Sequence, residues 1–141
     1  MATQHQLANA EKLTQEKKVN LFLLRCKVLL ETDEKGVLPA WIEDDIKPLN
    51  LTVDQAAMYY ANSALEIANR IDKWRSIAKC HLYRGHVFRK MKWWSDARDS
   101  YIRAASDKRF AADKGDRGLE ELISLCKRMK DNAREKRKEK K

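Results

Sequence analysis

Cys80, His81 and His86 are the residues of this sequence whose side chains most readily bind metals or act as nucleophiles and bases. A helix brings residues i and i+4 onto one face, but positions 80, 81 and 86 point in different directions around a helix. No Cys-x-x-Cys pair, no Gly-rich phosphate loop and no acid placed to orient a histidine accompanies them. We therefore expect no enzymatic activity, no metal site, no cofactor and no small-molecule substrate.

Three tryptophans stand next to cations, and this mixture is typical of surfaces that stack on nucleobases. The set consists of Trp74, Trp93 and Trp94 with Lys73, Arg75, Lys92 and Arg98. We expect Trp93 to pack on a neighbour or to stay half exposed, with Lys and Arg stems across it. Binding of RNA or DNA is the alternative function that residues 73–109 and the basic tail predict.

The net charge of +9 is concentrated in two segments. Residues 73–109 hold 11 Lys/Arg and 3 Asp/Glu, and residues 127–141 hold 9 and 3. The remaining segments, 1–72 and 110–126, are slightly acidic. Positive segments of this kind attract an acidic partner. In the tail, acids at four-residue steps equally fit a helix whose charges only solvate it.

The composition predicts an all-α protein. Only 4 glycines and 2 prolines occur in 141 residues, of which 43% are hydrophobic and 36% charged. Apolar residues recur at three- and four-residue steps in five segments, which predict five helices. The segments are 6–32, 52–70, 73–90, 95–107 and one from about 113 to 133. The second half of the first segment is apolar nearly all round, so we expect it to be buried. Thr52 is the expected N-cap of the second helix, and Ser95 or a neighbour that of the fourth.

We expect one domain over residues 1–126, with residues 33–51 inserted as a loop that has room for one helical turn. Residues 127–141 are expected to form a basic, frayed helical tail. No membrane span or secretory signal is expected. Cys26, Cys80 and Cys126 predict reduced, partly buried thiols. These features favour a cytoplasmic protein; the basic tail also fits a nuclear one, and a cytoskeletal or ciliary assembly is compatible with them.

The chain contains an internal repeat. An alanine-rich helical segment recurs after 40 residues, and the segment that begins at Leu23 is echoed after 59, which leaves a 19-residue insert. Small residues let two helices approach closely, so we expect two antiparallel hairpins in which Cys26 meets Ala57 and Gly85 meets Ala97. The full set of expected packing residues is Cys26, Leu29, Ala57, Ala61 and Ala64 in the first hairpin and Gly85, Phe88, Trp94, Ala97, Tyr101 and Ala104 in the second.

At these residues the sequence resembles the tetratricopeptide repeat family. The family signature has a small residue, a large one at plus three, and Ala, aromatic and Ala at plus twelve, sixteen and nineteen. Gly85, Phe88, Ala97, Tyr101 and Ala104 match these positions, and Trp94 matches the aromatic usual before the second helix. Residues 52–108 match well and residues 18–32 loosely, whereas His81 and Arg84 replace the usual Trp/Leu and Leu. The resemblance implies a right-handed superhelix of about two repeats plus a C-terminal capping helix.

Tetratricopeptide domains bind extended peptides or partner helices in a groove lined by the first helix of each hairpin. The resemblance assigns to that groove Lys79, Leu82, Tyr83, His86, Arg89 and Lys90, together with Lys27, Asn20, Leu23, Leu24 and Leu30. Apolar side chains beside cations suit an acidic and hydrophobic partner segment. We therefore expect a non-catalytic adaptor, scaffold or small subunit of a larger assembly that binds an acidic protein. Reversing Lys79 and Lys90 to Glu is expected to slow association at unchanged stability.

Overall fold

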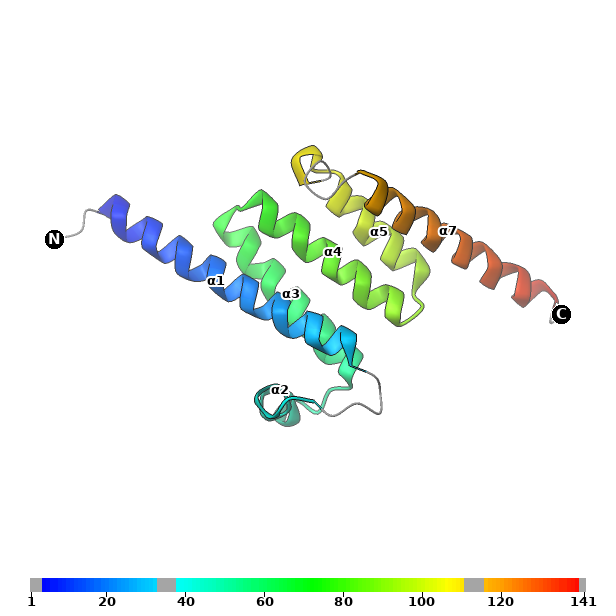
Figure 1. The fold of residues 1–141 in the computed structure, drawn as a ribbon, viewed down its shortest axis with the longest axis horizontal. Helices are drawn as coiled ribbons and strands as arrows, with labels where there is room; N and C mark the ends of the chain where they lie inside the picture. The colour runs from blue at the N-terminus through cyan, green and yellow to red at the C-terminus, as the bar shows by residue number, and fades with distance from the viewer. Residues whose placement is uncertain (1–3, 33–37, 111–115, 140–141) are drawn as a thin grey trace.

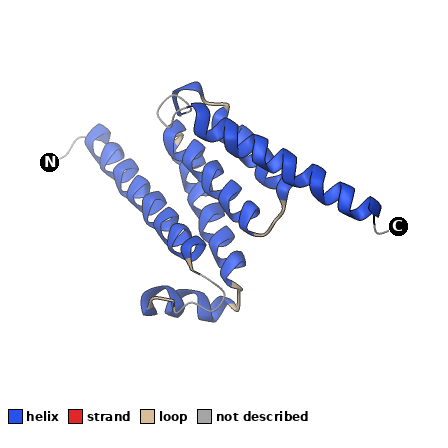
Figure 2. Ribbon diagram, turned by 45° about the vertical axis from the view of Figure 1, so that its right-hand side comes forward, coloured by secondary structure: helices blue, strands red, loops and turns tan. Residues whose placement is uncertain are grey.

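The computed structural model describes residues 4–32, 38–110 and 116–139, and every regular element in this part is helical (Figures 1 and 2). The prediction of an all-α protein is therefore confirmed. None of the described helices is long and apolar enough to cross a membrane. The elements are α1 (Gln4–Glu31), α2 (Ala40–Ile46), the 3₁₀ helix η1 (Lys47–Leu49), α3 (Val53–Ile71), α4 (Trp74–Lys90), α5 (Trp94–Ala105) and α7 (Asp116–Glu139).

α1 and α3 form an antiparallel hairpin. Cys26, late in α1, belongs to the same core cluster as Ala57, early in α3. Leu23 lies earlier in α1 and shares a cluster with Ala64, later in α3. Rising residue numbers in α1 thus meet falling numbers in α3. The alanines that face α1 are buried, and their small side chains let the two helices approach closely.

α4 packs against both helices of this hairpin. Cys80 shares a cluster with Leu23 and Ala64, and Val87 shares one with Cys26 and Ala57. α4 is therefore antiparallel to α3 and parallel to α1. α1 and α4 lie side by side although α3 separates them in the sequence (Figure 1).

α4 and α5 form the second antiparallel hairpin, and α7 packs against α5. Gly85 allows the close approach, although its nearest neighbour is Tyr101 rather than the expected Ala97. A Cβ on Gly85 would lie 2.6 Å from Cε1 and 2.7 Å from Cδ1 of the Tyr101 ring. The buried members of this core cluster are Ala78, Ala97, Tyr101, Ala104, Phe110, Leu119 and Cys126, with Phe88 and Trp94 partly buried against them.

The insert contributes to the core, although the sequence predicted a loop there. Residues 33–37 lie outside the described part, but α2 follows them and buries Ile42 and Ile46 in the cluster of the first hairpin. Arg25 of α1 holds the insert in place, because its guanidinium lies 3.0 Å from the carboxylate of Asp45. A helix of 7 residues is too short for hydrophobic periodicity to reveal.

α1 is less buried than its composition predicts. Leu21 and Leu24 are 47% and 51% exposed, and Leu13 is 54% exposed. α3 and α4 cover one side of the helix only, so the expected burial on all sides is wrong. An apolar stripe remains on the open side of α1.

The two expected helix caps have different outcomes. Thr52 caps α3 as predicted: its side chain accepts a hydrogen bond from the Gln55 N–H, and the Gln55 side chain accepts one from the Thr52 N–H. Ser95 does not cap α5. Trp93 occupies the N-cap position there, without a side-chain hydrogen bond.

α7 is longer than the predicted last helix, which ends at Ala133. It continues to Glu139 without a break at residue 126, the expected end of the domain. Leu119 and Cys126 are buried, whereas most side chains over 127–137 are exposed. The basic tail thus extends the last helix of the domain beyond the core (Figure 1).

Candidate partner-binding groove

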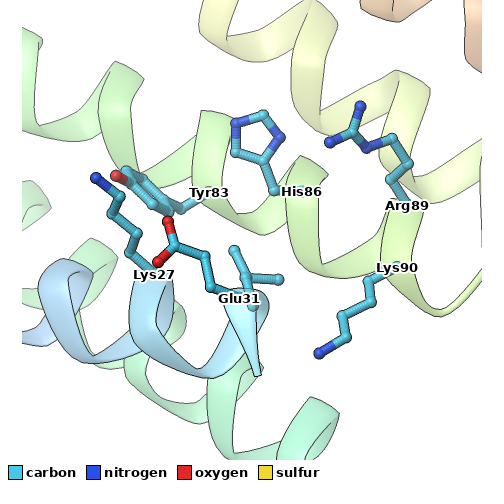
Figure 3. A pocket seen from close by; sticks show the side chains of 7 residues that line it. Lys27, Glu31, Tyr83, His86, Arg89 and Lys90 are labelled. Atoms are coloured by element: carbon cyan, nitrogen blue, oxygen red, sulfur yellow. The ribbon is translucent and has the colours of Figure 1, made fainter. Parts of the chain in front are cut away.

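A hollow of about 490 Å³ lies between α1 and α4 (Figure 3). The two helices run parallel, so residues 27–31 of α1 lie opposite residues 83–90 of α4. We call this hollow the α1–α4 groove. Its walls are formed by Lys27, Leu30 and Glu31 from α1 and by Tyr83, His86, Arg89 and Lys90 from α4.

Lys90 connects α4 to the end of α1 and to α3 at one end of the groove. Its ammonium donates hydrogen bonds to the carbonyl oxygens of Leu29 at 3.1 Å and Thr32 at 3.0 Å. It also lies 3.6 Å from the carboxylate of Asp54 in α3. The last carbonyls of a helix carry partial negative charge, and a cation there stabilises the helix end. Reversing the charge of Lys90 is therefore expected to lower the stability of the fold, whereas the sequence predicted that stability would not change.

Lys27 and Arg89 are the groove cations that are open to a partner. Within the described part of the chain, neither makes a hydrogen bond or an ion pair. Lys27 is exposed and Arg89 is half buried. Glu31, one turn after Lys27, brings one carboxylate to the same walls. The groove thus presents two cations that are not paired with other described residues and one carboxylate. We call such unpaired cations uncommitted.

His86 forms a neutral wall of the groove. Its Nδ1 lies 2.7 Å from the hydroxyl of Tyr101, and its ring is edge-on to Tyr83 at 5.8 Å between centroids. Burial, and secondarily Arg89, lowers the pKa of His86 to about 4. At neutral pH the imidazole therefore adds a polar but uncharged surface beside the two cations.

Most of the predicted partner-binding residues meet in the groove, but Leu82 and Lys79 do not line it. Leu82 packs against the cluster that α5 and α7 share with α4. Adjacent residues on a helix differ by about 100° in direction, so Leu82 turns toward this cluster while Tyr83 turns toward α1. Leu23, expected in the groove, is buried, and Glu31 was missed. The predicted residues that do line it are Lys27, Leu30, Tyr83, His86, Arg89 and Lys90.

The cysteines and histidines are distributed over separate regions. Cys26, Cys80 and Cys126 are buried free thiols. Burial raises the pKa of Cys26 and of Cys80 to about 12, so these thiols stay protonated and unreactive. His81 lies near Arg84 and Arg103, and its pKa is lowered by burial first and by these cations second. Among the residues described, no group of three or more His, Cys, Asp or Glu side chains is placed to hold a metal ion.

Comparison of the chain with known proteins finds no matching family model, no similar curated protein and no similar solved structure.

Proposed function

We propose that this protein is a non-catalytic protein–protein interaction module, an adaptor or small subunit of a larger assembly, whose α1–α4 groove binds an acidic and hydrophobic partner segment. The observation that carries the proposal is the uncommitted pair Lys27 and Arg89 beside Leu30 and Tyr83. Cations of this kind speed encounter with an acidic segment, while apolar anchors slow its release. Leu24, 51% exposed and one turn before Lys27, extends the apolar surface along α1.

We further propose a tetratricopeptide-like organisation, with α1/α3 and α4/α5 as two repeats of a right-handed superhelix and α7 as the capping helix. The 40-residue self-similarity supports it, because the repeated small residues lie in the two hairpins. Two repeats give a short groove, so the partner segment is short or the whole domain docks as a rigid block. We propose the cytoplasm as its location.

The test is selection from a displayed library of random peptides, followed by fluorescence anisotropy with the selected sequences. We expect them to combine Asp or Glu with Leu, Ile or Phe. Lys27→Glu with Arg89→Glu should weaken binding by roughly ten-fold or more, mainly through slower association. Lys27→Ala with Arg89→Ala should give a smaller loss of affinity. This second variant keeps the test usable if the charge-reversed variant does not fold.

The matched control is Lys17→Glu with Lys18→Glu, which changes the net charge equally at exposed positions of α1 outside the groove. Peptides without acidic residues, or equal losses in the groove variant and in the control, would contradict the proposed function. Circular dichroism melts of all variants establish that each one is folded.

A further inference from the structure

Trp93 presents an open indole ring at the connection between α4 and α5. It is 55% exposed, although one face of the ring packs on Phe88, with 5.9 Å between centroids and 19° between planes. The guanidinium of Arg84 in turn lies 5.8 Å from the Phe88 centroid. This packing fixes the orientation of the indole ring and leaves its other side open, which is the arrangement on which a nucleobase stacks.

The two basic segments of the sequence meet at the start of α5. α7 returns along α5, and the ammonium of Lys130 lies 3.5 Å from the hydroxyl of Ser95, two residues after Trp93. Figure 1 shows α7 continuing past the start of α5. The exposed cations of that extension are Arg134, Lys136 and Arg137.

Positive charge dominates this end of the molecule. Residues 84–98 and 127–137 together hold eleven Lys/Arg and three Asp/Glu. Lys92 is exposed and makes no ion pair with the described residues. The Nε atoms of Arg84 and Arg98 are buried without a hydrogen-bond partner in the described structure. Asp96 is the carboxylate that interacts electrostatically with Arg84. It neutralises only part of the local positive charge.

We propose that this surface, which we call the Trp93 corner, binds single-stranded nucleic acid by stacking a base on Trp93 and holding the adjacent phosphates on the surrounding cations. A single strand offers one flat ring and one negative charge per nucleotide, which matches an open indole ring within a field of cations. Bases in a duplex have no open face, and an acidic peptide has no ring of this kind. The residues of the Trp93 corner are Arg84, Phe88, Lys92, Trp93, Lys130, Arg134 and Arg137.

The experiment measures fluorescence anisotropy of a labelled oligothymidylate of about 20 nucleotides over a range of salt concentrations. Trp93→Leu should weaken binding about ten-fold and leave the slope of log Kd against log salt unchanged, because stacking carries no charge. Arg134→Glu with Arg137→Glu should make that slope shallower. Lys17→Glu with Lys18→Glu, distant in α1, should change neither quantity by as much.

A second readout keeps the test independent of the stability of the Trp93→Leu variant. Stacking quenches indole fluorescence, so the oligonucleotide should quench the wild-type protein and quench Trp93→Phe much less. Full quenching in Trp93→Phe, or binding that Trp93→Leu leaves intact, would overturn the proposal. Equal displacement of the oligonucleotide by duplex DNA or by polyglutamate would also overturn it, since either competitor lacks open bases. The outcomes for the two Trp93 variants do not bear on the α1–α4 groove, because Trp93 does not line it.

Discussion

Gly85→Ala tests how tightly the second hairpin is packed. A Cβ at this position would lie 2.6 and 2.7 Å from two atoms of the Tyr101 ring, so the ring or the helix must move. The ring has little room, because Tyr101 is fully buried and its hydroxyl lies 2.7 Å from Nδ1 of His86. We therefore expect the substitution to push α4 and α5 apart or to break the Tyr101–His86 contact.

Two opposing effects set the magnitude. Replacing a helical glycine with alanine stabilises by roughly 0.5–1 kcal/mol, whereas overpacking a core costs roughly 1–3 kcal/mol. The two ranges leave a net loss of about 0–2.5 kcal/mol. Because the Tyr101 ring has little room to move, we expect a loss of about 1–2 kcal/mol for Gly85→Ala, which lowers the Tm of a domain of this size by roughly 3–8 °C. Gly118 of α7 is the matched control, because a Cβ there meets nothing within 4 Å. Gly118→Ala should stabilise by up to about 1 kcal/mol.

Urea denaturation followed by circular dichroism measures both changes. A double-mutant cycle with Tyr101→Leu adds a direct check on the cause. Tyr101→Leu is itself destabilising, but Gly85→Ala should cost less in that background because the ring is gone. If Gly85→Ala is as stable as Gly118→Ala, or if Tyr101→Leu leaves its cost unchanged, the proposed clash does not limit the approach of α4 and α5.

Three further predictions concern stability. Lys90→Met should lower the free energy of unfolding by roughly 1–3 kcal/mol in urea titrations, since it removes a charged cap from the end of α1; Lys79→Met on the same helix is the control and should change little. The free energy of unfolding should be highest above pH 6.5 and should fall as the pH decreases toward about 4. The reason is that His86 has a pKa of about 4 in the folded state against an ordinary value of 6.5, so the unfolded chain binds a proton that the folded chain does not. Urea titrations of His86→Gln should show a flatter pH profile between these two values. Thr52→Ala should cost about 1 kcal/mol through loss of the α3 cap, and a cost near zero in thermal melts would contradict the capping role.

The sequence allowed the helices and many of the interhelical contacts to be predicted, since both depend on local spacing. The recurrence of small residues after 40 positions located the buried faces of α3 and α5. Thr52 was recognised as a cap because a capping box is a local pattern. Six groove residues were found because a resemblance supplied their direction around α1 and α4, which composition alone does not provide.

The features that were missed depend on neighbours distant in the sequence. Leu82 lies outside the groove because it packs against the core cluster on the side of α4 that α5 covers, and α5 begins only after α4 has ended. Leu24 remained exposed because no helix packs on the open side of α1 within the described residues. Lys90 acquired its role only when the chain placed the end of α1 next to it. None of these outcomes has a local signal.

The positive charge of the second hairpin has two physical uses, which net charge alone does not separate. Lys90 and Lys73 are held by partners in other helices, the latter 3.4 Å from Glu16, so they contribute to the fold. Arg89 remains uncommitted in the groove, and Lys92 remains so at the Trp93 corner. Residues 83, 86 and 90 of α4 share one face of the helix and residues 84 and 88 share another. The two surfaces therefore differ in direction as well as in composition, which is why a groove variant should affect acidic peptides and a corner variant should affect single-stranded nucleic acid.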